Sequence, residues 1–409
     1  MRRDDPDRVA SLDLIRGVAV LGILAINIAG FAGPTAGIAN PHLPTPGSFA
    51  DELAFAAKFL LFEGKMRALF TILFGASLVL FVERSEAAGR FGELLQMRRL
   101  AWLALFGLLH FYLLWWGDIL FLYAVCGVIA LLMRGLKVRQ LAVSALAIFA
   151  LWHLTGAALD APAVIAEQRV AQQTASTSEV EAHADYLSAV AAHAGQDLAV
   201  ARSGFIARAR HQLSDETLHP FDGVLSSFGE TLPLMLLGMV LLRSGFFTGS
   251  WPQQHLRALA RWGTLAGLAA TGAVLAWAWH RDFPPRAMES AFFYWMAIPH
   301  LLTATGYGAL LVLATPALAH SAIARRIAAA GRTALSNYIG TSLVMAGIFY
   351  GWGLGLAGTA GHAAQWLYVL LGWGLMLAWS EPWLRSFRRG PLEFLWRSLT
   401  EGRLLGFAR

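Results

Sequence analysis

Two side chains in one apolar stretch have the chemistry of a proton-transfer site. His110 and Asp118 lie within Arg98–Met133, where they are the polar groups that exchange protons most readily. A histidine with an ordinary pKa of about 6.5 can accept a proton from a hydroxyl group, and a nearby carboxylate can orient it. We therefore expect any chemistry near this pair. The alternative is a neutral imidazole that hydrogen-bonds a neighbouring helix and only sets packing.

The pair lies at the turn of a predicted membrane hairpin. Basic residues flank both outer ends of the hairpin, at 98–99 and at 134–139, whereas the shared turn carries Asp118. Since positive charge favours the cytoplasmic side, both outer ends are predicted to be cytoplasmic. At about 1.5 Å per residue, His110 lies roughly 18 Å along its helix from Arg98, in the outer half of a hydrocarbon layer about 30 Å thick. Asp118 is then expected at the outer interface.

Three further polar side chains are candidates because they are expected within or beside spanning segments. Asn27 lies about three turns beyond Arg16, at the depth of His110, and either belongs to the catalytic site or makes an interhelical hydrogen bond. Arg67 either reaches an anionic group near His110 or extends to the membrane interface. Glu230 pairs either with Arg67 or with an outer histidine, as a structural ion pair or within a site.

The composition identifies the class of protein. Of 409 residues, 57% are hydrophobic and 14% charged, and the mean hydropathy is +0.54, which indicates a polytopic helical membrane protein. The net charge of +6 does not indicate a nucleic-acid partner, because the basic residues lie in short connections between apolar stretches. The single cysteine, Cys126, excludes an intramolecular disulfide, and the histidine spacings match no metal signature, so no metal is expected.

The apolar stretches predict an all-α, polytopic membrane protein with about ten transmembrane helices. Basic residues precede the first stretch, follow the last one and recur on alternate connections, so both termini are expected in the cytoplasm. The spans are expected at about 12–31, 66–81, two within 98–133, then 141–158, 228–242, 258–279, 291–316, 333–356 and 364–383, with an interfacial helix at 49–62.

This pattern divides the chain into four parts. Residues 1–158 form an N-terminal five-span half, 159–226 an extracytoplasmic and mostly helical loop, 227–384 a C-terminal five-span half, and 385–409 a cytoplasmic amphipathic tail. The loop is too long for a tight connection, so it is either a lid over an outer cavity or a spacer.

Several motifs occur in one order along nearly the whole chain. They are SLDLIRGVAVLGILAINI, FTILFGASL, GLLHFYLLWWGDILFLYAVCG, LLGMVLLRSGFF, GRTALSNYIGTSL and GPLEFLWRSLT. Together they resemble the YeiB-like family of bacterial inner-membrane proteins, whose conserved region is a domain of unknown function. That family is, more distantly, similar to the transmembrane acyltransferases, which include the lysosomal heparan-glucosaminide acetyltransferase. The resemblance implies a multi-pass protein of the bacterial inner (plasma) membrane.

The resemblance also implies a function. In the acyltransferases a cytoplasmic acyl-CoA reaches a buried site, and the acyl group passes to an acceptor on the other side. The buried asparagine of their first-span motif matches Asn27, and their catalytic histidine lies in the following loop. The nearest loop histidine here is His42, at a different spacing, whereas His110 and Asp118 match the YeiB-like pattern.

Two main hypotheses follow. The first is acyl transfer from cytoplasmic acyl-CoA to an extracytoplasmic sugar or envelope component, with His110, Asp118 and Asn27 as catalytic residues. The alternative is a proton-coupled transporter or exporter of a small or lipidic solute; a non-catalytic scaffold is a third. The expected partners are the bilayer, the acyl donor and its acceptor, and a homo-oligomer stays open. The expected substrate-binding residues are Arg67, Glu230, Arg98, Arg99, Arg332 and Asn337.

Overall fold

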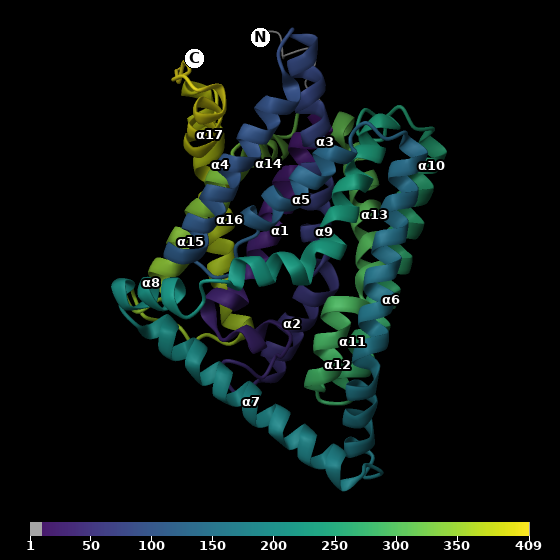
Figure 1. The fold of residues 1–409 in the computed structure, drawn as a ribbon, viewed down its shortest axis with the longest axis vertical. Coiled ribbons are helices and arrows are strands. Elements are labelled where there is room, and N and C mark those ends of the chain that lie inside the picture. Colours follow the sequence, from purple (N-terminus) through teal and green to yellow (C-terminus); the bar gives the residue numbers. More distant parts are fainter. Residues whose placement is uncertain (1–9, 409) are drawn as a thin grey trace.

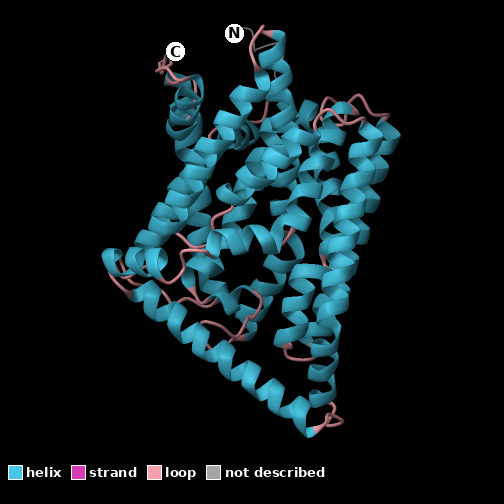
Figure 2. Cartoon of the chain, in the orientation of Figure 1, coloured by secondary structure: helices cyan, strands magenta, loops and turns pink. Residues whose placement is uncertain are grey.

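Helices make up most of the computed structural model, which describes residues 10–408. Over this range Figure 2 draws helices and loops, and the only extended pairing is an isolated bridge between Phe387 and Ala408. In chain order the helices are α1 (Ala10–Ala32), η1 (Thr35–Ile38), α2 (Phe49–Leu61), α3 (Lys65–Ala87), α4 (Gly92–Leu113), α5 (Leu120–Met133), α6 (Val138–Ala171), α7 (Thr177–Arg202), α8 (Phe205–Ser214), α9 (His219–Arg243), α10 (Gln253–Ala258), η2 (Leu259–Gly263), α11 (Thr264–Trp279), α12 (Pro285–Ser290), η3 (Ala291–Trp295), α13 (Ala297–Leu318), α14 (Ala322–Arg332), α15 (Ala334–Phe349), α16 (His362–Ser386) and α17 (Pro391–Glu401).

A helix lies at each predicted span. Six helical stretches among the described residues are long and apolar enough to cross a membrane; they contain α1, α2 with α3, α6, α9, α10 to α11, and α13. The helices α5 and α15 are apolar but shorter, and α4 and α16 complete the predicted set. The prediction of an all-α polytopic membrane protein is therefore confirmed. The basic segment at 1–9, which contributed to the predicted orientation, lies outside the described residues.

Three helices form the centre of the bundle. In the apolar windows of α1, the α2–α3 stretch and α9, 72%, 61% and 56% of residues are buried, against 22% in α6 and in the α10–α11 stretch. The helices α3 and α9 pack closely because Gly238 has no side chain: a Cβ there would lie 1.9 Å from the Ile72 carbonyl oxygen. The exposed apolar sides of α6 and α11 are those expected to face lipid.

The segment after α6 covers one end of the bundle. The helix α6 continues beyond the predicted span to Ala171, and α7 then crosses the end of the molecule opposite α17 before the short α8 (Figure 1). Ser176 and Glu179 form a capping box that begins α7. At its far end, Asp197 accepts hydrogen bonds from the backbone and hydroxyl of Thr35, which fixes α7 to η1.

The amphipathic tail docks against the bundle. The indole of Trp396 on α17 donates a hydrogen bond to the Arg99 carbonyl on α4. The carboxylate of Glu393 accepts hydrogen bonds from the backbone of Leu335 and Ser336, at the N-terminus of α15. These contacts attach α17 to the same end of the bundle as the start of α1 (Figure 1).

Candidate functional site

His110 and Asp118 form a buried pair at the turn between α4 and α5. The Nδ1 atom of His110 lies 2.9 Å from Oδ1 of Asp118, and the two side chains are 1% and 3% exposed. The other carboxylate oxygen accepts the Phe121 backbone N–H at 2.9 Å, which also satisfies the start of α5. Gly107 makes this approach possible, since a Cβ there would lie 2.3 Å from the Phe121 nitrogen. The turn therefore brings the two predicted residues into contact.

The second ring nitrogen of His110 is available for chemistry. Nε2 is buried and has no hydrogen-bond partner among the described residues. With the proton of the neutral ring on Nδ1, where it is donated to Asp118, Nε2 carries a lone pair, which is the tautomer that a general base requires. The ring also lies 5.0 Å from that of Tyr338 and 6.3 Å from that of Trp115, measured between centroids. These aromatic rings enclose the site.

A recess reaches this enclosure from the end of the bundle that carries α17, and we call it the inner recess after the predicted orientation. It is a cavity of about 230 Å³ whose deep wall includes Ile119, Leu120, Tyr123 and Tyr338. Tyr338 separates the recess from His110, and its hydroxyl donates a hydrogen bond of 3.3 Å to the Gly117 carbonyl. The recess therefore ends one aromatic ring away from the His110–Asp118 pair.

The recess opens into a basic vestibule of about 600 Å³. Eight arginines and three acidic residues line the vestibule. Burial, followed by the charges of Arg397 and Arg388, lowers the pKa of Arg389, so the positive charges here are close enough to repel one another. Glu393 lines both cavities, and burial raises the pKa of its carboxyl group. The vestibule residues that carry charge are Asp13, Arg16, Arg84, Arg90, Arg99, Arg332, Arg388, Arg389, Glu393, Arg397 and Glu401.

A second cavity, of about 620 Å³, lies on the other side of the pair, and we call it the outer cavity after the predicted orientation. Its lining is mostly apolar and comes from η1, the α7 residues Tyr186 and His193, the segment around α12, and Trp116 of the α4–α5 turn. Tyr186 fixes the middle of α7 by donating to Glu289 at 3.0 Å, and Arg286 stacks on its ring at 3.6 Å. Helix α7 of the long segment thus contributes one wall of this cavity.

Trp115 and Trp116 lie between the two cavities. Both indole N–H groups donate to the Gly30 carbonyl of α1, at 3.4 and 3.3 Å. Trp115 is 3% exposed and stacks on Phe31 with ring centroids 4.3 Å apart. The His110–Asp118 pair therefore lies in a packed layer, with the inner recess on one side and the outer cavity on the other.

Glu230 pairs with Arg67 rather than with an outer histidine. The Nη2 and Oε2 atoms are 2.8 Å apart, and both side chains are largely buried. The Arg67 carbonyl accepts a hydrogen bond from Thr71, whose hydroxyl also bonds that of Tyr123 in the wall of the inner recess. The ion pair thus contacts the recess through Thr71 and Tyr123 and is not part of its lining.

The remaining predicted residues occupy different places. Arg99 and Arg332 line both the recess and the vestibule, whereas Arg98 and Asn27 are outside both linings. Asn337 is 1% exposed and its side chain is fully engaged: the amide donates to the Ala330 carbonyl, Thr333 and Ser380, and its oxygen accepts from Trp379. Asn337 therefore joins α14, α15 and α16. The supporting hydrogen bonds are 2.8 to 3.2 Å long.

Tyr338 is a site residue that the sequence analysis missed. Its position was detectable in principle, because residues 334, 335 and 338 lie at helical spacing and all line the inner recess. In the sequence they read only as part of an apolar span. Trp116 lies in the α4–α5 turn, and the sequence did not predict it as a wall of the outer cavity.

Comparison with known proteins identifies the family. Residues 241–403 match the family model described as "Protein of unknown function (DUF418)". The chain is 30% identical to the uncharacterised protein YxaH of Bacillus subtilis (strain 168), over 96% of this chain and 94% of that protein. It is 28% identical to the uncharacterised protein YeiB of Escherichia coli (strain K12), over 96% of both chains.

A shorter match covers about a third of the chain. An uncharacterised 39.9 kDa protein from the amylase 3′ region of Bacillus acidopullulyticus is 34% identical over 31% of this chain and 34% of its own length. No solved structure matches. The full-length similarity to YxaH and YeiB spans both the His110–Asp118 turn and the segment of the family model, so the chain belongs to the YeiB-like family of DUF418 proteins.

Proposed function

We propose that the protein transfers an acyl group from a cytoplasmic acyl-CoA to a hydroxyl acceptor, such as a sugar or envelope component, that enters from the outer side. One observation carries this proposal. A recess leads from the arginine-lined vestibule to Tyr338, whose ring lies against His110. This is the arrangement expected of an enzyme whose anionic donor and proton-accepting base lie at opposite ends of one cavity.

The donor site is the basic vestibule. Guanidinium groups bind phosphate oxygens with charge-assisted and often bidentate hydrogen bonds, and CoA carries several phosphates. Burial and, after it, the charges of Arg397 and Arg388 lower the pKa of Arg389, and a bound anion offsets both effects. The narrower recess beyond it has a mostly apolar wall of Phe70, Phe74 and Leu103, which suits an acyl chain better than a phosphate.

The chemistry requires His110 as the base. Nε2 takes the proton of the acceptor hydroxyl, and the oxygen of that hydroxyl forms a bond to the thioester carbonyl carbon. The carbon–sulfur bond then breaks, and His110 returns the proton to the sulfur, which leaves as the CoA thiol. Asp118 holds the ring in the required tautomer and stabilises the imidazolium. Tyr338 must rotate to join the recess to the base.

The proposal includes a location. We assign the protein to the bacterial inner membrane with both termini in the cytoplasm, so that the vestibule faces cytoplasmic acyl-CoA and the cavity beneath α7 faces the outside. The relatives come from bacteria, and the basic residues gather at the end of the bundle that carries the vestibule.

A thermal-shift titration of the detergent-purified protein with acetyl-CoA and longer acyl-CoA tests the donor site. Binding to the folded state raises stability by about 2.7 kcal/mol at a hundredfold excess over the dissociation constant. An Arg388→Gln/Arg389→Gln variant is expected to bind at least about tenfold more weakly, because each lost charged hydrogen bond contributes about 1.5–3 kcal/mol.

Arg261→Gln is the matched control, since Arg261 is an exposed arginine on the same side that stacks on Trp262 and is not part of the vestibule. It is expected to bind like the wild type. Absence of any shift with acyl-CoA, in protein that unfolds cooperatively, would overturn the proposal and favour a transporter.

A further inference from the structure

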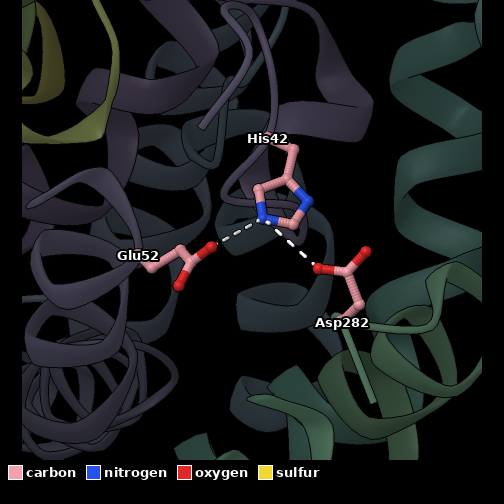
Figure 3. A group of neighbouring side chains, drawn as sticks. All are labelled: His42, Glu52 and Asp282. Atoms are coloured by element: carbon pink, nitrogen blue, oxygen red, sulfur yellow. Dashed lines mark hydrogen bonds and ion pairs between the residues drawn. The ribbon is translucent and has the colours of Figure 1, made fainter. Parts of the chain in front are cut away.

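Three side chains on the outer face form a cluster that the acyl-transfer proposal does not use. His42 follows η1, Glu52 lies on α2, and Asp282 lies in the turn between α11 and α12. One nitrogen and two carboxylate oxygens, one from each residue, all lie within 4.8 Å of one another. Figure 3 shows that both carboxylates approach the same ring nitrogen of His42.

The separations suit a tetrahedral metal ion. His42 Nε2 is 3.1 Å from Glu52 Oε1 and 3.7 Å from Asp282 Oδ1. Zinc bonds to nitrogen and oxygen ligands are about 2.0–2.2 Å long, so neighbouring ligand atoms around a tetrahedral ion are about 3.3–3.5 Å apart. A small movement of Asp282, whose side chain is 86% exposed, brings the third ligand into place.

A hydrogen-bonding explanation accounts for only part of this arrangement. A single N–H group directs its hydrogen toward one acceptor, and 3.7 Å to Asp282 is too long for a hydrogen bond. The two carboxylates carry a combined charge of about −2 within 4.8 Å of each other, which a divalent cation neutralises. The cluster therefore has the charge and the ligand set of a cation site.

The surroundings hold the ligands in place. The free oxygen of Glu52 accepts a hydrogen bond of 2.9 Å from the Trp279 indole, an orienting contact of the kind made by metal-bound carboxylates. Asp282 and Phe283 have backbone φ angles of 58° and 54°, a conformation that residues other than glycine adopt rarely. The edge of the His42 ring packs against Phe283, with centroids 5.8 Å apart.

We propose that His42, Glu52 and Asp282 bind one divalent transition-metal ion, of which zinc is the best match, with a fourth position open to water. The imidazole ligand favours zinc over magnesium or calcium, which prefer oxygen ligands alone. The ion joins the loop after η1 and α2 to the α11–α12 turn. It lies beside the outer cavity, whose lining includes Asn40 and Pro285. This departs from the expectation that the protein has no metal, and it does not depend on acyl transfer.

Metal analysis of the full-length protein tests the site. The protein is purified in detergent with a tag that lacks histidine, exchanged into zinc, dialysed, and assayed by mass spectrometry of the bound metal. We expect about one zinc per chain and, with Co²⁺ instead, the strong visible absorption of a tetrahedral site. Asp282→Asn is expected to bind at least tenfold more weakly, and its exposed position makes misfolding an unsuitable explanation. His42→Ala is expected to abolish binding.

His211→Ala is the control, because His211 and Asp215 form another histidine–carboxylate pair, 2.7 Å apart, that has no third ligand within residues 10–408. It is expected to retain the metal. The proposal is overturned if the wild type retains no metal, or if Asp282→Asn retains as much metal with the same affinity. It is also overturned if His211→Ala loses the ion to the same degree, since that outcome indicates adventitious binding.

Discussion

His110 and Asp118 depend on each other because both are removed from water. Each side chain is almost fully buried. Among the described residues, the Asp118 carboxylate is hydrogen-bonded by the His110 ring and the Phe121 N–H. A buried carboxylate without a partner is far less favourable than one that is hydrogen-bonded. Removal of either member is therefore expected to lower the free energy of unfolding, whatever the catalytic role of the pair.

His110→Ala is predicted to lower the free energy of unfolding by about 3 kcal/mol or more, because it leaves the Asp118 carboxylate unpaired. His153→Ala is the comparison: His153 is equally buried on α6, but its contact is with the Phe149 carbonyl, so a loss of about 1–2 kcal/mol is expected. Denaturation in detergent measures both. Equal losses would contradict the account of the pair.

The residue scale also separates what the sequence could reveal from what it could not. His110 and Asp118 are eight positions apart across one turn, so local geometry was enough to predict their contact. The partners His42 and Asp282 are 240 positions apart, and only the packing of α2 beside α11 unites them. Asn337 was predicted to bind substrate, and in the structure its side chain bonds the neighbouring helices α14 and α16, contacts that only the fold reveals.

At the scale of elements, α17 and α7 close the two ends of the bundle. Glu393 attaches helix α17 to the bundle, because its carboxylate accepts hydrogen bonds from the backbone N–H groups at the start of α15. Glu393 also lines the vestibule. The amphipathic pattern of this tail was enough to predict an interfacial helix. It could not predict the contact with α15, because the two segments meet only in the folded protein. Likewise, the length of the 159–226 segment indicated a lid or a spacer but not the Asp197–Thr35 contact that fixes α7.

Glu393→Gln is predicted to change how stability depends on pH. Burial raises the pKa of Glu393 in the folded state above its unfolded value of about 4.3, so the folded state favours the protonated form. The wild type therefore loses stability as the pH rises from that value through the raised folded pKa. The glutamine variant keeps an oxygen that accepts the same N–H groups but does not titrate.

Thermal unfolding of both proteins between pH 4.5 and 7 measures this effect. As the pH rises, the unfolding temperature of the wild type is expected to fall relative to that of Glu393→Gln. A difference that is constant with pH, or that changes in the opposite direction, would show that burial does not determine the pKa of Glu393.

At the scale of the whole molecule, the arrangement of ten predicted spans places the two cavities at opposite ends. The sequence was sufficient for the helical class and the approximate spans, because apolar length and basic connections are local signals. It was not sufficient for the cavities, whose walls come from segments as distant as α1 and α17. The helix expected at 333–356 instead ends at Phe349, before a glycine-rich connection.

Labelling of introduced cysteines measures the orientation of the protein in the membrane. Cys126, the one native cysteine, is fully buried and is expected to remain unlabelled. A membrane-impermeant maleimide is expected to label Gln172→Cys, at the end of α6, in intact spheroplasts, and Arg403→Cys, after α17, only after lysis. Labelling of Arg403→Cys in intact spheroplasts would contradict a cytoplasmic vestibule.

The most direct test of the central claim is acyl transfer in inverted membrane vesicles that contain the overproduced protein. With acetyl-CoA labelled in its acetyl group, the account predicts that label moves to an envelope component while an equal amount of free CoA thiol appears. His110→Gln should transfer at least about a hundredfold more slowly while still binding acetyl-CoA. Transfer by His110→Gln at the wild-type rate, or no transfer by vesicles that bind acetyl-CoA, would contradict it.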